Sequence, residues 1–342
     1  IGRAHVWERV YFGRVSPYVN VYCRKINSTG AWKKIISVND MVTNYFAKDN
    51  KLFLLSKKNA PNGKVLMMNT DRPDIAKATV LIQEKSIPIQ SEISQSKNFL
   101  LIPYMKNGVL MNHQMIDMRT NKISKIPFPE NTNLMYVTPF NMNNDDVHIV
   151  RMGWTTPNSY TYSNLDKPFA KEKRFSFRKD AGYPFTNEIA VDEIEIPGHD
   201  GVMIPISVIH RKDVKLNGQN PAYVYSYGAY GYSSGAFFSP TFLLLAQKGI
   251  VLTVAHVRGG GEKGESWHLS GYKQSKPNTW KDLNSTAQYL IDKGYTGTKY
   301  LSCEGGSAGG ILIGRAITEQ PDLWACAVPQ VGCLSMVRQE FA

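Results

Sequence analysis

The chain has 342 residues, of which 42% are hydrophobic and 20% charged, and Lys and Arg exceed Asp and Glu by 12. This length predicts two domains, and the composition is that of a globular protein rather than a disordered or fibrous one. No apolar run is long enough to span a membrane, and the four cysteines form no C-x-x-C pair, so the sequence indicates neither a membrane protein nor a zinc or disulfide framework.

The positive charge shows no concentrated nucleic-acid signature. Its densest run, residues 171–179 (KEKRFSFRK), interleaves aromatic and cationic side chains. A single run of this kind is more typical of a solvated strand or linker, so we expect no nucleic-acid partner. The chain starts at Ile1 without a start methionine or a signal-peptide pattern, so we expect the natural N-terminus to be absent. Neither localisation nor oligomeric state follows from the sequence.

Residues 1–185 read as short β-strands that repeat. Three runs, at residues 50–55, 97–102 and 145–150, share one pattern, and their strands start at Lys51, Asn98 and Asp146, which are 47 and 48 residues apart. Repeats of about 40–50 residues with several short strands each are typical of β-propeller blades. Residues 6–12 give a fourth candidate one period earlier. The spacing predicts a β-propeller of about four blades, with an irregular β-sandwich as the alternative.

A turn at residues 181–184 marks the predicted boundary, with the propeller in residues 1–185 and a second domain in residues 186–342. After a hairpin over residues 191–209, buried-type strands at 222–226, 250–257, 299–303 and 325–328 alternate with helices at 239–247, 279–293 and 308–319. Thr279 and Asp282 are spaced as an N-terminal capping pair. Alternation of this kind predicts a mostly parallel sheet with helices on both faces.

The glycine-rich segment 259–264 (GGGEKG) fits the G-x-G-x-x-G pattern, follows a strand, and has Asp282 eighteen residues further on. A dinucleotide fold needs a helix that opens directly from these glycines. Residues 265–272 give no helical signal, which returns only near Thr279. We therefore expect no nucleotide cofactor, and a nucleotide-binding enzyme is kept as an alternative.

A second glycine-rich segment, residues 303–310 (CEGGSAGG), lies between a strand and a helix. A serine flanked by glycines at such a turn, here Ser307, fits the nucleophile elbow of α/β-hydrolases. The glycines are needed because the backbone is strained and a Cβ would collide with a neighbouring element. The first free N–H groups of the helix then face the place where an oxyanion would form. The alternatives are a plain glycine-rich turn and a phosphate cradle, although the segment lacks the Gly-Lys-Ser/Thr ending of a P-loop.

Several segments jointly resemble the prolyl oligopeptidase family of serine peptidases. The matching segments are 225–231 (YSYGAYG), 257–268 (VRGGGEKGESWH), 304–310 (EGGSAGG), 321–324 (PDLW) and 329–332 (PQVG). Their order and spacing run from about Glu193 to Arg338, while the first half is similar to the family's propeller in layout. The resemblance implies a partial β-propeller followed by an incomplete α/β-hydrolase domain.

The same resemblance implies roles for individual residues. Ser307 is the nucleophile, and the oxyanion hole falls on the hydroxyl of Tyr227 and the backbone N–H of Ala308. Tyr230 and Cys333 take positions that line the specificity pocket in the family. Ordinary apolar packing is the alternative for these two, and a buried tyrosine is the alternative for Tyr227. The family implies no metal and no cofactor.

Some positions depart from the family pattern or have no role yet. Ala308 stands where prolyl peptidases often have Asn, and its context is also typical of oligopeptidase B, the branch that cuts after Arg or Lys. Gly306 stands where that branch commonly has Arg, which favours the prolyl side. Arg258, Trp267 and His268 belong to the family signature, but no chemical role for them follows from the sequence.

The order Ser, Asp, His is expected for the triad of an α/β-hydrolase. Only 35 residues follow Ser307, and they contain one aspartate, Asp322, beside a helix-stopping proline, and no histidine. Without a histidine base the serine hydroxyl is a weak nucleophile at neutral pH. We therefore expect the triad aspartate and histidine beyond residue 342, and these 342 residues alone to be inactive.

The sequence thus predicts a serine oligopeptidase that hydrolyses internal bonds of short peptides, after proline, through an acyl-enzyme. Cleavage after Arg or Lys is the runner-up specificity. A non-catalytic propeller-based binding protein and a nucleotide-binding enzyme are the alternatives outside this class. We expect peptides as partners, and no membrane.

Overall fold

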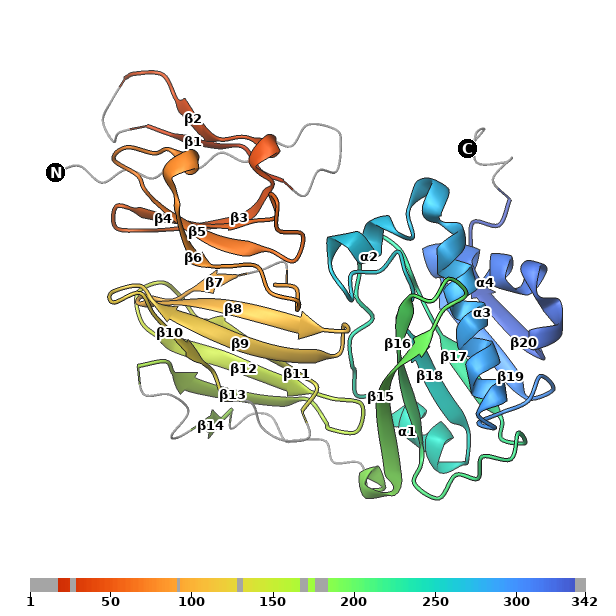
Figure 1. Cartoon of the computed structure of the whole chain (residues 1–342). Helices are drawn as coiled ribbons and strands as arrows, with labels where there is room; N and C mark the ends of the chain where they lie inside the picture. The colour runs from red at the N-terminus through yellow and green to blue at the C-terminus, as the bar shows by residue number, and fades with distance from the viewer. Residues whose placement is uncertain are drawn as a thin grey trace.

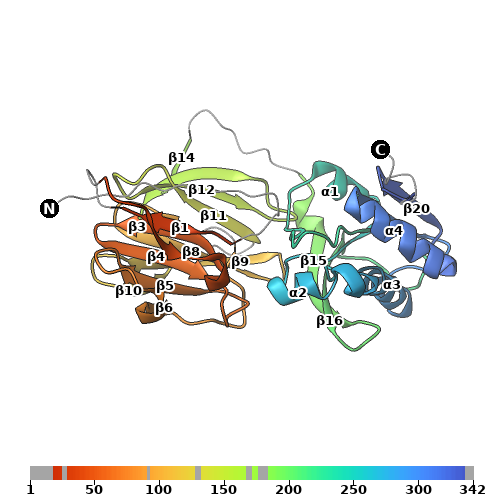
Figure 2. The same cartoon turned by 90° about the horizontal axis from the view of Figure 1, so that it is seen from above.

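The computed structural model describes residues 18–24, 29–90, 93–127, 132–166, 172–175 and 184–335. These residues form two halves that lie side by side, an all-β half with the N-terminus and an α/β half with the C-terminus (Figures 1 and 2). The predicted boundary at residue 185 falls between the last strand of the first half and the first strand of the second. Its position within that interval stays a prediction.

The N-terminal half consists of consecutive antiparallel sheets, each built from strands that are neighbours along the chain (Figure 1). A two-stranded sheet pairs β1 (Val21–Cys23) with β2 (Lys33–Ile36). Three four-stranded sheets follow: β3 (Val42–Lys48), β4 (Lys51–Ser56), β5 (Lys64–Asn69) and β6 (Thr79–Ile82); β7 (Ser94–Gln95), β8 (Phe99–Lys106), β9 (Leu110–Asp117) and β10 (Lys122–Lys125); β11 (Leu134–Pro139), β12 (Asp146–Met152), β13 (Ser159–Asn164) and β14 (Lys173–Arg174).

The predicted repeat coincides with these sheets. Strands β4, β8 and β12 begin at Lys51, Phe99 and Asp146, and each is the second strand of its own four-stranded sheet. One repeat therefore makes one sheet, as expected for propeller blades. The fourth candidate, residues 6–12, lies outside the described residues, so the total of about four blades stays a prediction.

The middle strands read as continuous hydrophobic runs because they are buried on both faces. In β8, Leu100 and Ile102 pack with Phe53 of the preceding sheet, whereas Phe99 and Leu101 pack with Ile149 of the following one. All of these side chains are buried. A strand with two buried faces belongs to the middle of a stack of sheets, so the arrangement is a row of blades rather than a two-sheet sandwich.

The C-terminal half is built on one six-stranded sheet with the order β15-β16-β18-β17-β19-β20. Its strands are β15 (Ile189–Pro197), β16 (Met203–Arg211), β17 (Ala222–Tyr225), β18 (Val251–Ala255), β19 (Leu301–Gly306) and β20 (Cys326–Gln330). The first hairpin is antiparallel and β16 is antiparallel to β18, while β18, β17, β19 and β20 pair in parallel. The mostly parallel sheet expected from the sequence is confirmed.

Helices cover both faces of this sheet. The helices are α1 (Pro240–Gln247), α2 (Glu265–Leu269), α3 (Pro277–Asp292) and α4 (Ala308–Glu319). The described residues also form the short 3₁₀ helices η1 (Val38–Asp40), η2 (Ile75–Lys77), η3 (Thr186–Glu188), η4 (Lys273–Ser275) and η5 (Pro321–Leu323). Residues of α3 and α4 share one buried core with the strands, and residues of α1 share a different core. The two separate cores show that the helices lie on opposite faces of the sheet (Figure 2).

The core under α1 also joins the two halves. Met105, Leu134 and Trp154 of the propeller half pack in one buried cluster with Leu243 and Leu252 of the α/β half. Such a shared apolar core holds the propeller half against the α/β half on the face of the sheet that α1 covers.

Two sequence-based expectations are wrong in detail. Helix α3 begins at Pro277, two residues earlier than predicted, so Thr279 and Asp282 lie inside the helix and are fully buried instead of capping its N-terminus. A five-residue helix, α2, follows directly after Gly264, where no helical signal was expected.

Of the basic run 171–179, Lys173 and Arg174 form β14, and residues 171 and 176–179 lie outside the described part of the chain. Among the described residues, no helix has the length and apolar character of a membrane span.

Candidate active site

Ser307 occupies the turn between β19 and α4. Its backbone has φ 55° and ψ −116°, a left-handed conformation that is strained for a residue with a Cβ, and its side chain is exposed. The N–H of Ser307 donates to the carbonyl oxygen of Gln330 at 2.9 Å, which ties the turn to β20. The serine hydroxyl therefore stands clear of the backbone at the carboxyl end of the parallel strands.

The glycines around Ser307 are needed for close backbone packing. A Cβ on Gly305 would stand 2.6 Å from the Ser226 carbonyl oxygen, and a Cβ on Gly309 would stand 2.9 Å from the same atom. A Cβ on Gly310 would stand 2.6 Å from the Cα of Gly332. These separations leave no room for a side chain. The segment is therefore a tight strand-to-helix turn of the kind that the nucleophile-elbow motif predicts.

The first backbone N–H of α4 is free to face an oxyanion. The helix begins at Ala308, so the Ala308 N–H is among the four that have no acceptor within the helix. The N–H of Gly310 already donates to the carbonyl oxygen of Ser307 at 2.9 Å. The Ala308 N–H therefore has no acceptor within the helix, and its role as an oxyanion donor stays a prediction.

Tyr227 lies against the same helix start. It follows β17, and a Cβ on Gly309 would stand 3.3 Å from the Tyr227 Cα and 3.4 Å from its ring atom Cδ2. Partial burial, followed by the neighbouring Tyr230 and Tyr232, raises the pKa of the Tyr227 hydroxyl above its usual value. The group therefore stays protonated at neutral pH and is able to donate a hydrogen bond.

Two further tyrosines surround Tyr227. The ring of Tyr230 lies 6.4 Å from the Tyr227 ring, and the ring of Tyr232 lies 5.7 Å from it in an edge-on arrangement. Tyr230 is 79% exposed and Tyr232 is 62% exposed. Tyr232 was not predicted from the sequence, although the spacing of tyrosines from 223 to 232 is a signal that could have shown it.

Cys333 reaches the elbow from another segment. It follows Gly332, which packs on Gly310 in the first turn of α4, and its side chain is exposed. The predicted site residues thus come from three places: the loop after β17, the elbow itself, and the loop after β20. Their roles in catalysis and substrate binding stay proposals.

A cavity of about 920 Å³ opens between the two halves, and Tyr232, whose ring packs against that of Tyr227, is one of its lining residues. Its lining residues from the propeller half include Gln90, Ser94, Met105, His113, Leu134, Tyr136 and Met152, and those from the α/β half include Tyr223, Tyr225, Tyr232, Ser234, Phe237, Phe242 and Glu304. Burial lowers the pKa of His113 to about 4, so this side chain is neutral at pH 7. Pockets of this size between domains are typical places for substrates to bind.

Comparison with known proteins identifies the family. The model of the prolyl oligopeptidase family matches residues 236–342, and the model of its N-terminal β-propeller domain matches residues 14–172. The chain belongs to the prolyl oligopeptidase family. The antiparallel sheets of the first half are accordingly blades of a β-propeller, and the second half is of the α/β-hydrolase fold.

Individual relatives are similar to this chain over more than nine-tenths of its length. A prolyl endopeptidase of Elizabethkingia meningoseptica is 28% identical over 336 residues, which cover 93% of this chain and 44% of that protein. A solved structure from a study of two prolyl endopeptidases has a TM-score of 0.84 at 26% identity and covers 94% of this chain and 46% of its own. Oligopeptidase B from Trypanosoma brucei, at 24% identity, shows the same fold with a TM-score of 0.78 and covers 92% and 46%. The chain spans less than half the length of these relatives.

The other glycine-rich turn, residues 259–264, is filled by the protein itself. A Cβ on Gly259 would overlap the carbonyl oxygen of Gly228, and a Cβ on Gly261 would overlap that of Gly231. Glu262 is buried, and its Oε1 accepts the N–H of Ser234 at 3.0 Å. These glycines allow two backbone segments to touch, so the turn has no space for a dinucleotide pyrophosphate.

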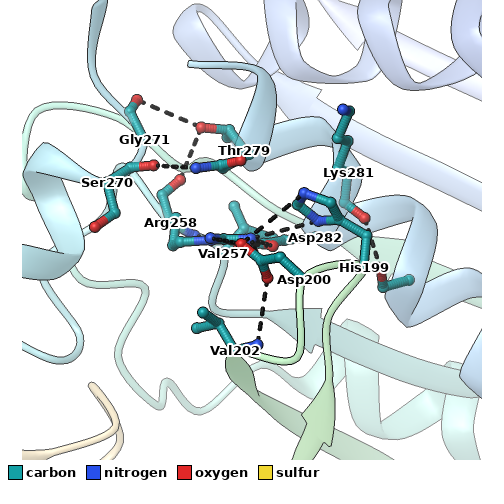
Figure 3. A network of polar contacts seen from close by, with 12 residues as sticks. His199, Asp200, Val202, Val257, Arg258, Ser270, Gly271, Thr279, Lys281 and Asp282 are labelled. Atoms are coloured by element: carbon teal, nitrogen blue, oxygen red, sulfur yellow. Dashed lines mark hydrogen bonds and ion pairs between the residues drawn. The ribbon is translucent and has the colours of Figure 1, made fainter. Parts of the chain in front are cut away.

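Arg258 has the structural role that the sequence did not reveal. Its backbone N–H and its guanidinium donate to Asp282 at 2.6–3.2 Å, and the guanidinium also donates to Asp200 at 2.6 and 3.2 Å (Figure 3). The hydrogen bonds from Arg258 hold the pKa of the Asp200 carboxyl below its usual value. Arg258 and Asp282 are both fully or almost fully buried. The Asp282 carboxylate is therefore committed to Arg258 and is not placed to bind a ribose.

A buried row of polar side chains connects the propeller to the loop after Tyr227. The Trp154 ring N–H donates to Glu193 Oε1 at 2.7 Å, and the Ser207 hydroxyl donates to Glu193 Oε2 at 2.6 Å. Because Ser207 has only one proton to give, it accepts from Nε2 of His256 at 2.9 Å, which places a proton on that nitrogen. Nδ1 of His256 then faces Glu262 Oε1 at 3.8 Å.

Lys276 provides another fixed point for this loop. Its ammonium donates to the carbonyl oxygen of Gly228 at 2.6 Å, and burial lowers its pKa to about 8. Gly228 itself has φ 60°, and a Cβ there would stand 2.5 Å from a methyl carbon of Thr279. The backbone next to Tyr227 is thus held by α3 and by Lys276, the residue that precedes this helix. Sequence reasoning missed Lys276 and Glu262 because their partners are distant along the chain.

Proposed function

We propose that this chain carries the nucleophile and the oxyanion hole of a serine oligopeptidase that hydrolyses internal bonds of short peptides. The observation that supports this best is the backbone of Ser307, which is strained at φ 55° while the side chain is exposed. Strain of this kind persists where the surrounding packing imposes it, and it is common at active sites. The family relationship supports the same chemistry.

The geometry suggests how the residues act. The Ser307 oxygen attacks the carbonyl carbon of the substrate while a general base takes the hydroxyl proton. The carbonyl oxygen becomes an oxyanion that accepts hydrogen bonds from the Ala308 N–H and the Tyr227 hydroxyl. The base returns its proton to the leaving amine, the C–N bond breaks, and water then hydrolyses the acyl ester. No step of this sequence calls for a metal or a cofactor.

The general base and its aspartate partner are expected outside this chain. Asp322, the one aspartate after the serine, lies at the start of η5 directly after α4. The relatives that match are more than twice as long as the chain. We propose that the aspartate and histidine of the triad come from the rest of the protein, so that the 342 residues alone are inactive.

For specificity we propose cleavage after proline, with the propeller admitting only short peptides. A matching relative is a prolyl endopeptidase that aligns over 93% of this chain. The Tyr230 ring lies near that of Tyr227, and Cys333 follows Gly332, which packs on Gly310; we propose that an apolar ring of the substrate packs against Tyr230 and Cys333. Cleavage after Arg or Lys, as in oligopeptidase B, is the competing specificity.

Labelling with an active-site serine phosphonate tests the nucleophile. The full-length protein that contains this chain should take up one phosphonate group, on Ser307, and the Ser307→Ala variant should take up none. Mass spectrometry of the labelled peptide identifies the site. A label on another serine, or no label on the intact protein, would exclude the proposal.

The oxyanion role of Tyr227 is tested in the same protein. Tyr227→Phe removes one donor to the developing charge and should lower kcat by about 100-fold with little change in KM. Tyr300→Phe removes a hydroxyl from an exposed tyrosine before β19 and serves as the matched control with unchanged kinetics. Equal kcat values for the two variants would show that Tyr227 is only a packing residue.

A further inference from the structure

Glu304 is the only residue with a formal charge among those that line the cavity between the two halves in the described part of the chain. The rest of the lining is apolar, aromatic or neutral and polar, and His113 is neutral at pH 7 because burial lowers its pKa to about 4. The chain as a whole carries a net charge of +12, yet no lysine or arginine that the structure describes lines this space. The one formal charge among the described lining residues of this cavity is therefore negative, although the protein as a whole is basic.

The Glu304 carboxylate is held in place without being neutralised. The side-chain amide of Gln330 donates to Oε1 at 2.8 Å, and the Tyr223 hydroxyl is its second partner. Burial, followed by this hydrogen bond to Glu304, raises the pKa of the Tyr223 hydroxyl. Both partners are neutral donors, and the described residues include no cation in an ion pair with Glu304. The negative charge remains available to a ligand.

Several aromatic rings line the same cavity as this carboxylate. Tyr225 is directly opposite Glu304 in the parallel pairing of β17 with β19, and Tyr223, Tyr232 and Phe237 line the same cavity. The faces of aromatic rings attract ammonium and guanidinium groups, and they do so most strongly where water is excluded. A carboxylate among tyrosines is thus a site for an organic cation.

The position of Glu304 relates this site to the elbow. Glu304 lies on β19 three residues before Ser307, a span of about 10 Å along an extended strand. An extended peptide advances by about the same distance in three residues. A substrate that runs from Ser307 toward the cavity would therefore bring a side chain or terminus within about three residues of the scissile bond to Glu304.

We propose that Glu304, together with the tyrosines of the cavity, forms a subsite for a positively charged group of the peptide substrate. The group is a lysine or arginine side chain, or the N-terminal ammonium of a short peptide, within about three residues of the bond that is cut. This inference rests on the proposed peptidase function. It adds a preference for cationic peptides that is separate from the residue recognised beside Tyr230 and Cys333.

The test compares peptides that differ only in one positive charge. In a series based on one proline-containing peptide, lysine is placed at each position near the scissile bond and compared with norleucine, which lacks the ammonium group. A second arm compares free with acetylated N-termini, and so distinguishes the two sources of charge. The full-length protein gives kcat/KM, and its Ser307→Ala variant gives the dissociation constant of each uncleaved peptide.

We expect the charged peptide to be preferred about tenfold at one position, through KM and the dissociation constant rather than kcat. The preference should shrink as salt is raised, because the charge interaction is screened. In Glu304→Gln, which has nearly the same shape, the preference should disappear, whereas Asp322→Asn, an exposed carboxylate variant outside the cavity, should keep it.

Several results would overturn the inference. Equal binding of lysine and norleucine peptides at every position would do so, as would a preference that survives in Glu304→Gln. If Glu304→Gln lowers the melting temperature, the salt dependence of the wild-type preference for lysine over norleucine peptides tests the subsite in its place. A preference that does not change with salt would exclude the subsite. Failure of phosphonate labelling at Ser307 would overturn the peptidase proposal, but binding to the Ser307→Ala variant would still report on the subsite.

Discussion

Two glycine-rich turns of this chain are similar in sequence but differ in the groups that pack against them. Both the 259–264 turn and the 305–310 turn follow a strand of the parallel sheet and lead into a helix. In the first, Gly259 and Gly261 make room for the carbonyl oxygens of another loop of the same protein. In the second, nothing lies within 4 Å of a Cβ placed on Gly306, and Ser307 is exposed.

The comparison shows that a glycine-rich pattern indicates where another group approaches the backbone closely, but it does not indicate whether that group is the protein's own backbone or a ligand. At the 259–264 turn the approaching group is backbone, and buried charges such as Glu262 complete the packing. At the elbow the glycines bring strand and helix together, and the strained serine is left facing open space. The first turn is therefore structural, while the second has room for a substrate.

The largest expected difference between the turns is in their tolerance of a methyl group. Gly261→Ala places a Cβ into the carbonyl oxygen of Gly231 and should lower the free energy of unfolding by about 3 kcal/mol. Gly306→Ala adds the same group in open space and should change that free energy by no more than about 0.5 kcal/mol. Urea unfolding of both variants measures the difference, and equal losses would contradict the comparison.

A smaller effect should appear at Ser307, where the strain is confined to one residue. Ser307→Gly removes the Cβ that makes φ 55° unfavourable and should make the protein about 1 kcal/mol more stable than Ser307→Ala. Both variants lack the hydroxyl, so neither should take up phosphonate. The measurement is again urea unfolding, and a glycine variant less stable than the alanine variant would show that the turn is not strained.

The smallest expected effect is on the loss of stability at low pH. Of the two turns, the 259–264 turn is the one that adjoins an ion pair, between Arg258 and Asp200. The pKa of Asp200 is lowered by its hydrogen bonds to Arg258, so this carboxylate stabilises the fold above its unfolded pKa of 3.8, and the contribution is lost as the pH falls through the lower folded value. Asp200→Asn should therefore lose less stability than the wild type between pH 5 and pH 2, whereas Asp322→Asn should behave like the wild type. An identical acid response in all three proteins would exclude the ion pair as a source of stability.

The sequence was sufficient for the features that depend on local patterns. The repeat predicted to begin at Lys51, Asn98 and Asp146, the alternation of strands and helices after residue 189, and the turn at Ser307 all follow from periodicity or from short motifs. The assignment of Thr279 and Asp282 as a capping pair was wrong because the same spacing serves a different purpose. Inside α3, Thr279 donates to the carbonyl oxygen of Arg258 and Asp282 accepts from Arg258.

Features that depend on distant partners were out of reach of local patterns. The row from Trp154 through Glu193 and His256 to Glu262 links residues that are far apart in the sequence and meet only when the propeller and the sheet come together. Glu304 lies within the motif noted in the sequence, but only the structure shows that no described lining residue of its cavity is a lysine or arginine. The neighbours of a charged side chain are set by tertiary packing, which the spacing of residues along the sequence does not reveal.

The Arg258 cluster also bears on how long the folded state survives. Its contacts with Asp200 and Asp282 close chain segments of 58 and 24 residues. Such contacts form only after the segments between them have been ordered, so we expect them to be absent from the folding transition state. Interactions that form late slow unfolding and leave the folding rate nearly unchanged. Arg258 would then slow the unfolding of the loop that positions Tyr227. It would lengthen the lifetime of the folded site more than it increases the folding rate.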